Sequence, residues 1–149
     1  MADRARAQRI ADAVGRGMYA RDHAAQMLGI TLVEIGPGRA RMTMAVRPDM
    51  VNGHDICHGG LTFTLADTAF AYACNAYNHP AVAASCNIVF TAPAKRGDTL
   101  TAVAEEKSQA GRSGVYDIAV SDQNGRTVAL FRGHSRRLDG KVVEDAETM

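Results

Sequence analysis

The sequence predicts an α+β protein in which a curved antiparallel sheet wraps around one long, buried central helix. Residues 59–77 carry apolar side chains on almost every side of a helical pattern, which is typical of a helix enclosed by the rest of the protein. Six other runs are β-branched or alternate between apolar and polar residues, and short turn-like connectors separate most of them. Strands joined in this way pair antiparallel, and the apolar helix is the layer that covers their inner face.

Length and composition indicate one domain. The 149 residues with a net charge of +1 are enough for a hydrophobic core and give no reason to expect a nucleic-acid partner. We expect a single domain over residues 1–149, with residues 1–29 as an N-terminal helical extension and residues 141–149 as a polar, frayed tail. No apolar run reaches membrane-spanning length, and the Arg- and Ala-rich start is not a secretory signal. Three cysteines without an export signal favour reduced thiols and a cytoplasmic location.

The N-terminal residues 4–28 have the apolar spacing of a helix. Gly15 and Gly17 are expected to interrupt this helix, because glycine is a poor helix former. Gly29 is expected to end it, because glycine commonly follows the last helical residue.

Two strands precede the central helix, at residues 30–35 and 39–47, and the Gly-Pro-Gly sequence between them is a turn. The second strand alternates and so has one buried face, on which we expect Ala40, Met42, Met44 and Val46. Four more strands follow the helix, at residues 82–90, 99–105, 115–121 and 127–136. Three connectors separate these four, and the last contains the hairpin signal Asn-Gly; they lie at residues 93–98, 108–114 and 122–125.

The central helix begins with two glycines and contains a single charged residue. Asp67 is the only residue from Gly59 to Tyr77 that is charged at neutral pH, and burying a lone carboxylate is costly. Asp67 therefore either lies on a wet edge or caps a neighbouring element, or it lines a pocket and takes part in chemistry. Gly59 and Gly60 place bare N–H groups at a helix N-terminus, where they can donate to an oxygen that gains negative charge. Taken alone, the glycine pair is better explained as a flexible turn into the helix.

The spacing of Gly59 and Asp67 has a consequence for assembly. Eight residues of helix rise by roughly 12 Å, so the two residues of one chain cannot both touch the same carbonyl group. Either they serve different pockets, or a second subunit brings its Asp67 to the Gly59 of the first. The second arrangement requires a two-fold dimer with two equivalent sites at the interface.

Several segments together resemble the PaaI-type hotdog thioesterases. The most specific are residues 51–60 (Val-Asn-Gly-His-Asp-Ile-Cys-His-Gly-Gly) and 63–75, and the similarity extends over about residues 28–138. Further matching segments are residues 84–86, 90–93, 97–102, 114–118 and 127–133. The resemblance implies the hotdog fold, which is a curved antiparallel sheet around one long central helix, here with an extra N-terminal helix.

The resemblance also implies an activity and an assembly. Members of the family hydrolyse acyl-coenzyme A thioesters without a metal or organic cofactor, coenzyme A being part of the substrate. The implied substrates are phenylacetyl-CoA, especially its ring-hydroxylated forms, or similar medium-sized aryl- or acyl-CoA thioesters in phenylacetate degradation. The implied assembly is a homo-oligomer with active sites between subunits, often a dimer of dimers, without a nucleic-acid or membrane partner.

Carried over residue by residue, the resemblance assigns the chemistry to a few positions. Gly59 supplies the backbone N–H that polarises the thioester carbonyl, with Gly60 beside it, and Asp67 is the catalytic carboxylate. Asn52 and His58 match positions that contact the reacting group or the attacking water. Asp67 either attacks the carbonyl to form an anhydride or removes a proton from water. An apolar setting would raise the pKa of Asp67, which suits a base better than a nucleophile.

The remaining matched positions concern water and the coenzyme A moiety. Ser85 matches a hydroxyl that helps to position water near the carboxylate. Two regions match those that receive the nucleotide and the pantetheine arm, and the basic side chains in them are candidates for phosphate contacts. The substrate-binding residues expected in these regions are Pro93, Lys95, Arg96, Gly97, Gly111, Arg112, Ser113 and Gly114.

Other functions fit parts of the same sequence. Cys57 adjoins His58 at a helix start, where a thiolate nucleophile would be stabilised, but neighbours in sequence often point apart. Together with His54 and Asp67 these residues could bind a metal, although the spacing of paired ligands is missing. A non-catalytic acyl-CoA sensor or carrier would use the same pocket but would not need the carboxylate. A hotdog dehydratase relies on a His–acid pair in motifs that this sequence lacks.

Overall fold

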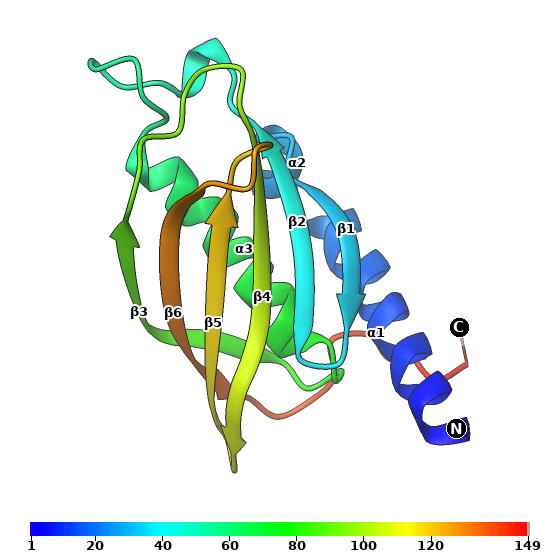
Figure 1. The fold of residues 1–149 in the computed structure, drawn as a ribbon. Coiled ribbons are helices and arrows are strands. Elements are labelled where there is room, and N and C mark those ends of the chain that lie inside the picture. The colour runs from blue at the N-terminus through cyan, green and yellow to red at the C-terminus, as the bar shows by residue number, and fades with distance from the viewer. Residues whose placement is uncertain (149) are drawn as a thin grey trace.

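The computed structural model describes residues 1–148 and consists of one curved sheet, a central helix and a helical N-terminal extension (Figure 1). In chain order the elements are α1 (Ala2–Arg21), α2 (His23–Met27), β1 (Thr31–Gly36), β2 (Arg39–Ala45), the 3-10 helix η1 (Pro48–Met50), α3 (Gly59–Asn75), β3 (Ala81–Phe90), β4 (Thr99–Ala110), β5 (Ser113–Ser121) and β6 (Thr127–Arg137). The predicted order of helix, two strands, buried helix and four strands is confirmed. Within the described part of the chain, no helix is both long enough and apolar enough to cross a membrane.

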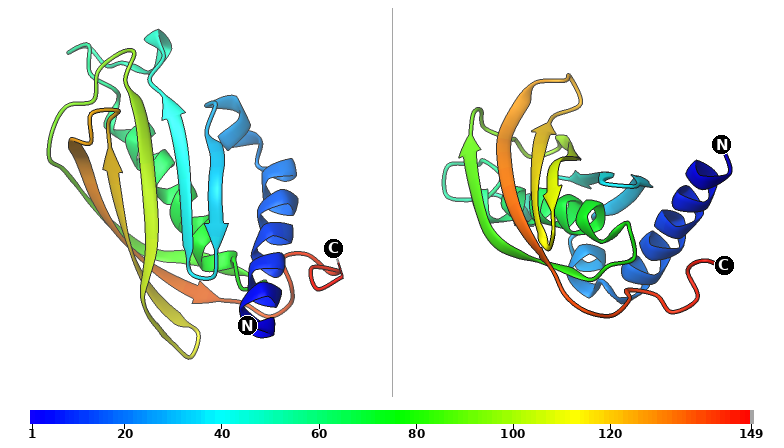
Figure 2. Two further views of the ribbon diagram at one scale, coloured as in Figure 1. Left: turned by 45° about the vertical axis from the view of Figure 1, so that its right-hand side comes forward. Right: turned by 90° about the horizontal axis from the view of Figure 1, so that it is seen from below.

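The strands form one antiparallel sheet in the order β1-β2-β4-β5-β6-β3. Helix α3 lies against the inner face, and the sheet bends around it, as the view from below shows (Figure 2). After α3 the chain crosses to the far side of the sheet, where β3 pairs with β6 and forms one edge. The predicted α+β arrangement, a curved antiparallel sheet around one central helix, is confirmed.

The inner face of the sheet combines large and small side chains beneath α3. Strand β2 alternates as predicted, and its Met42 and Met44 are 0% and 1% exposed. Met42 pairs across the ladder with Ala102 of β4, and Ala40 pairs with Ala104. The small partners leave room for the helix, while the methionines fill the space beside it.

An aromatic cluster anchors α3 to β5 and β6. The ring centroid of Phe70 lies 5.6 Å from that of Tyr116 and 6.0 Å from that of Phe131. On Gly133 of β6, a Cβ atom would lie only 2.8 Å from two atoms of the Phe70 ring. The absence of a side chain at this position therefore sets how closely the helix approaches β6.

Replacing Gly133 with alanine is expected to lower the free energy of unfolding by about 1–3 kcal/mol through overpacking. Phe70 is 1% exposed, so its ring cannot move aside without disturbing its neighbours. Urea denaturation of Gly133→Ala and Gly53→Ala tests this, because a Cβ on Gly53 would meet nothing within 4 Å. Equal losses in the two variants would contradict the packing argument.

Helix α1 packs against the β1 edge of the sheet. The Gln8 side-chain amide donates to the Ile35 carbonyl at 2.7 Å, and the Tyr19 hydroxyl donates to the Ile30 carbonyl at 2.8 Å. One side chain thus occupies a backbone acceptor of β1 itself, and the other holds the residue just before the strand. Helix α1 therefore covers part of the β1 edge, although Val33 in the same strand is 52% exposed.

The glycines of α1 serve close packing and do not interrupt the helix. The prediction of breaks at Gly15 and Gly17 is wrong, because α1 runs through both and the chain bends at Asp22, which caps α2. A Cβ on Gly15 would lie 2.9 Å from Leu32 Cδ2, and one on Gly17 would lie 2.8 Å from Val143 Cγ2. Tertiary contact thus outweighs the weak helix propensity of glycine here.

The C-terminal segment lies against α1 and the turn that follows α3. The Asn78 side chain accepts from the N–H groups of Val142 and Val143 at 3.1 and 2.9 Å, and it donates to the Val143 carbonyl at 2.9 Å. The prediction of a frayed tail is therefore wrong at residues 142 and 143, which these bonds hold, whereas Met149 lies outside the described residues. Polar composition did not reveal that one asparagine ties the segment down.

Strands β4 and β5 extend further than predicted. After an irregularity in β4, the ladder continues until Ala110 pairs with Ser113. The expected connector at residues 108–114 is therefore wrong in extent, and only Gly111 and Arg112 form the turn. These residues project from the core and are mostly exposed, so no apolar alternation marked them as strand.

Strand β3 forms the open edge of the sheet. Large apolar side chains on it are half exposed: Val82 51%, Val89 56% and Phe90 53%. Next to this edge, α3 presents its least buried stripe, whose members are Gly60, Thr64, Asp67, Thr68 and Ala71. The described part of the chain thus leaves a strand edge and a helix face uncovered side by side.

Candidate active site

A cavity of about 430 Å³ opens at the N-terminal end of α3. The start of the helix, the polar loop before it and the segment after β3 all contribute to its wall. The lining residues are Asn52, Ile56, Cys57, Gly59, Thr62, Phe90, Thr91, Ala92, Pro93, Ala94 and Val128. The cavity is therefore mostly apolar, with a few polar groups converging at the helix start.

One backbone N–H at the start of α3 has no acceptor among residues 1–148. The His58 side chain caps the helix by accepting the Gly60 N–H at its Nδ1 atom, at 3.0 Å. The His58 carbonyl accepts the N–H groups of Leu61 and Thr62 at 2.9 and 3.3 Å. Gly59 alone keeps an unused N–H at the positive end of the helix dipole, where a ligand oxygen can receive it.

The histidine cap separates the roles of the two glycines. The sequence placed Gly60 beside Gly59 as a carbonyl donor, but the Gly60 N–H already bonds to His58. His58 uses Nδ1 for this bond, so only its Nε2 side is open to a ligand. Of the two glycines, only Gly59 therefore keeps an N–H that is free within the described chain, and His58 is the residue that orders the helix start.

Phe90 was missed as a site residue by the sequence analysis. Its ring stands over the helix start, and a Cβ on Gly59 would lie 3.0 Å from Phe90 Cζ. The signal was available in the register, because Phe90 lies two and four residues beyond Ile88 and Cys86, which also face α3. Glycine at position 59 thus provides both the free N–H and the space beside the ring.

Asn52 organises the loop that leads into the helix. Its side-chain oxygen accepts the N–H groups of His54 and Ile56 at 2.9 and 3.3 Å. The backbone of Asn52 closes the same loop by donating to the Ile56 carbonyl at 2.8 Å. These bonds leave the amide NH₂ of Asn52 as a donor at the cavity wall.

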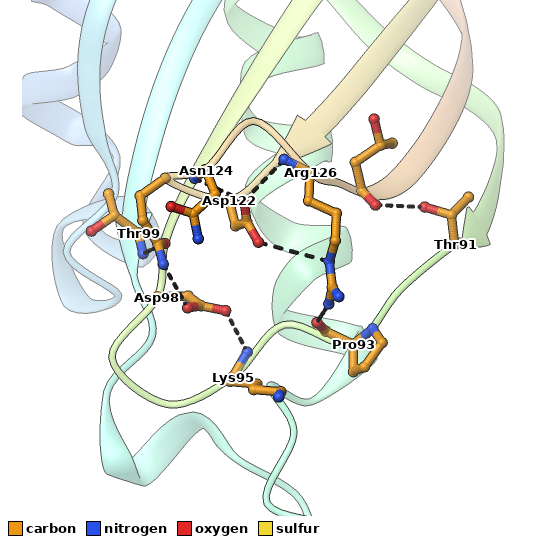
Figure 3. Close-up of polar contacts among 10 residues, drawn as sticks. Thr91, Pro93, Lys95, Asp98, Thr99, Asp122, Asn124 and Arg126 are labelled. Atoms are coloured by element: carbon orange, nitrogen blue, oxygen red, sulfur yellow. Dashed lines mark hydrogen bonds and ion pairs between the residues drawn. The ribbon is translucent and has the colours of Figure 1, made fainter.

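The loop after β3 is held against the sheet and the helix start. Asp98 accepts the Lys95 N–H at 2.8 Å and a Gln123 amide hydrogen at 3.0 Å, and Arg126 donates to the Pro93 carbonyl at 2.8 Å (Figure 3). The bond from the Lys95 N–H and, after it, the bond from Gln123 hold the pKa of Asp98 below its ordinary value. Asp98 is therefore ionised at neutral pH and continues to accept the hydrogen bonds that hold the cavity-lining loop in place.

Asp67 lies about two turns along α3 from Gly59 and does not line the cavity. Its side chain has no hydrogen bond or ion pair with any residue of the described chain. Partial burial raises the pKa of Asp67, because a carboxylate loses hydration there without gaining a partner. A proton acceptor of raised pKa therefore stands on the uncovered face of the helix.

Ser85 and Asp67 of one chain do not come together. Ser85 is exposed and pairs with His134 on the outer face of the sheet, whereas Cys86 faces inward. Burial, and to a smaller extent the Asp67 charge, raise the pKa of the Cys86 thiol. Within one chain, Cys86 is thus the β3 residue whose pKa is raised, beyond the effect of burial, by the charge of Asp67.

The alternative sites gain no support from the structure. Cys57 is 4% exposed, and burial raises the pKa of its thiol, which disfavours a nucleophilic thiolate. Among residues 1–148 no group of three or more His, Cys, Asp or Glu side chains is arranged to hold a metal ion.

The predicted substrate-binding residues fall into two groups at opposite ends of the sheet (Figure 1). The group in the loop beside the cavity consists of Pro93, Lys95, Arg96 and Gly97. The group at the tip of the β4–β5 hairpin consists of Gly111, Arg112, Ser113 and Gly114. In the hairpin Arg112 pairs with Asp139 at 2.6 Å. A single chain does not unite the two groups.

This fold, with a free N–H at the start of the central helix and an unpaired carboxylate further along it, defines a thioester hydrolase of the hotdog class. The chain belongs to the thioesterase superfamily, whose family model matches residues 54–129. The predicted family membership, fold class and enzyme class are confirmed.

Individual relatives agree with this assignment. Acyl-coenzyme A thioesterase PaaI of Escherichia coli K12 is 50% identical over 129 residues, which cover 87% of this chain and 92% of that protein. The structure of the E. coli PaaI protein from the phenylacetic acid degradation operon matches with a TM-score of 0.87 and 48% identity, covering 89% of this chain and 96% of that one. The Streptococcus mutans protein smu.793, solved bound to acetyl CoA, matches with a TM-score of 0.72 and 25% identity over 75% of this chain and 90% of that one.

Proposed function

We propose that the protein hydrolyses phenylacetyl-CoA, preferably with a hydroxylated ring, or aryl-CoA thioesters of similar size. The observation that carries the proposal is the unused Gly59 N–H at the wall of a mostly apolar cavity. Such a donor can bind the oxygen of a thioester carbonyl as it gains charge. The 50% identical relative named acyl-coenzyme A thioesterase PaaI supports the substrate class.

In the proposed reaction, water attacks the carbonyl carbon and gives its proton to Asp67. Negative charge moves to the carbonyl oxygen, where the Gly59 N–H stabilises it. The tetrahedral intermediate then collapses, the C–S bond breaks, and the coenzyme A thiolate leaves with the bonding electrons. The raised pKa of Asp67 favours the role of general base over that of nucleophile.

We place each active site between two subunits. Gly59 and Asp67 lie about 12 Å apart along one helix, and only Gly59 lines the cavity. The open β3 edge and the adjacent uncovered stripe of α3 support a two-fold contact with a second copy. In that contact the Asp67 of one subunit faces the Gly59 of the other, and we propose that such dimers pair into tetramers.

The same two-fold arrangement explains the separated substrate-binding groups. If β3 pairs antiparallel with its copy, the hairpin end of one subunit comes to the same end as the Gly59 loops of the other. Gly111–Gly114 of one chain and Lys95–Gly97 of its partner would then flank one coenzyme A moiety. The proposed reaction needs no metal or organic cofactor, and we propose that it takes place in the cytoplasm.

The test is free-thiol release from a panel of phenylacetyl-CoA, its ring-hydroxylated forms and linear acyl-CoA thioesters. The proposal expects the highest kcat/KM with the ring-hydroxylated substrates. Tight coenzyme A binding without thiol release from any substrate would instead identify a carrier or sensor. Higher kcat/KM with linear chains would contradict the proposed acyl specificity.

A further inference from the structure

A second cavity, of about 710 Å³, adjoins the first and shares Ile56 and Pro93 with it. The loop before α3 forms one side of this cavity, and the loop after β3 forms the other. Its lining residues are His54, Asp55, Ile56, Pro93, Lys95 and Arg96. Basic side chains are thus concentrated next to the mostly apolar cavity that contains Gly59.

An ion pair crosses this cavity between the two loops. Arg96 Nη2 donates to Asp55 Oδ1, and the two side chains are 52% and 66% exposed. The neighbouring Lys95 ammonium has no ion pair within residues 1–148. In the free protein, therefore, Asp55 is already ion-paired with Arg96, and Lys95 is, among the described residues, the unpaired cation of the two that line the cavity.

Both ends of the ion pair stand on ordered backbone. Asp55 has a positive φ of 59° in the turn that Asn52 closes. Ile56 and Lys95 form a β-bridge, and the Gly97 N–H donates to the Val46 carbonyl at 2.9 Å. Because these backbone bonds hold the two loops side by side, they also hold Asp55 within reach of Arg96.

We propose that Asp55 is a specificity-determining residue that competes with the phosphates of the ligand for Arg96. The inference rests on the proposed function, because it assumes that a phosphate-bearing thiol or thioester enters this cavity. An exposed ion pair is weak, so a doubly charged phosphate can displace Asp55 from Arg96. A neutral thiol such as unphosphorylated pantetheine cannot form an ion pair with Arg96. Asp55 thus lowers the affinity for phosphorylated ligands, leaves that for neutral ones unchanged, and so sets how strongly the cavity prefers a phosphate.

The test compares the binding of coenzyme A and of unphosphorylated pantetheine by calorimetry. Asp55→Asn should bind coenzyme A roughly twofold to fivefold more tightly than the wild type, because Arg96 becomes available. The preference for coenzyme A over pantetheine should rise by the same factor. Asparagine is well tolerated at positive φ, so the turn should be preserved.

Two further variants separate competition from a general charge effect. Asp117→Asn removes the same charge and breaks an exposed pair with Arg132 on the outer face of the sheet, so its coenzyme A affinity should match that of the wild type. In an Arg96→Gln background, Asp55→Asn should give a much smaller gain. Equal gains with and without Arg96, or no gain for Asp55→Asn, would overturn the inference.

The binding measurement is independent of turnover. A protein that binds coenzyme A but releases no thiol would end the proposed function while the Asp55 comparison still decides the inference. A protein that hydrolyses thioesters while Asp55→Asn leaves coenzyme A affinity unchanged would end the inference alone. Absence of coenzyme A binding in the wild type would end both.

Discussion

Replacing Asp67 with asparagine is expected to lower kcat by roughly 10²- to 10⁴-fold, which is the usual contribution of a general base. The amide keeps the size of the side chain and cannot take a proton from water. Coenzyme A affinity should be retained, because the proposed contacts with coenzyme A come from the loop that contains Lys95 and Arg96 and from the β4–β5 hairpin, and not from Asp67. Free-thiol release measures kcat, and calorimetry measures binding. Wild-type turnover in Asp67→Asn would remove Asp67 from the mechanism.

The raised pKa of Asp67 also predicts opposite effects of pH on activity and stability. Wild-type activity should rise with pH through the folded-state pKa, which lies above the ordinary value near 3.9. The ionised carboxylate destabilises the folded state, so wild-type stability falls as pH rises from the ordinary pKa to the raised one. Asp67→Asn should therefore unfold at a higher temperature than the wild type at neutral pH. The difference should vanish below pH 4, and a lower unfolding temperature at neutral pH would contradict the assignment.

Replacing Gly59 with proline is expected to lower kcat by roughly 10²- to 10³-fold, the usual effect of losing one oxyanion donor. Proline removes the only free N–H at the start of α3 and is favourable at the first helical position. The preceding His58 has φ −55° and ψ 129°, which a following proline accepts. Assays of free-thiol release at saturating substrate measure the effect.

The matched control is Gly59→Ala. Alanine adds the same Cβ contact with Phe90 and keeps the N–H, so the ratio of the two variants isolates the donor. Circular dichroism should give both variants the same helix content. Equal kcat values for alanine and proline would show that the Phe90 contact, and not the N–H, limits the reaction.

The sequence predicted the fold where residue patterns determine local structure. The alternation from Ala40 to Val46 reports one buried face directly, and the apolar surroundings of Leu65 and Phe70 identify the enclosed helix. Features that depend on tertiary contacts were mispredicted. Gly15 and Gly17 looked like helix breakers because sequence propensity does not include the neighbours that pack against them.

The sequence predicted those features of the site that depend on local helix geometry, and missed those that depend on side-chain conformation or on contacts between distant loops. The 12 Å rise between Gly59 and Asp67 follows from helix geometry alone, and the structure agrees that only Gly59 lines the cavity. The use of the Gly60 N–H by His58 depends on a side-chain rotamer, which no spacing rule specifies. The contact between Asp55 and Arg96 joins loops 41 residues apart, so no local pattern could reveal it.

Subunit complementation tests the central claim, that each reaction centre takes Gly59 from one chain and Asp67 from another. Gly59→Pro and Asp67→Asn chains would carry different affinity tags and be co-expressed, and tetramers would be dissociated to dimers before purification through both tags. Native mass spectrometry would confirm that each purified dimer contains one chain of each variant. Such a dimer retains one intact site, so the account predicts about half of the wild-type activity per dimer, although each variant alone is nearly inactive. Mixed dimers that remain as inactive as the separate variants would contradict the account.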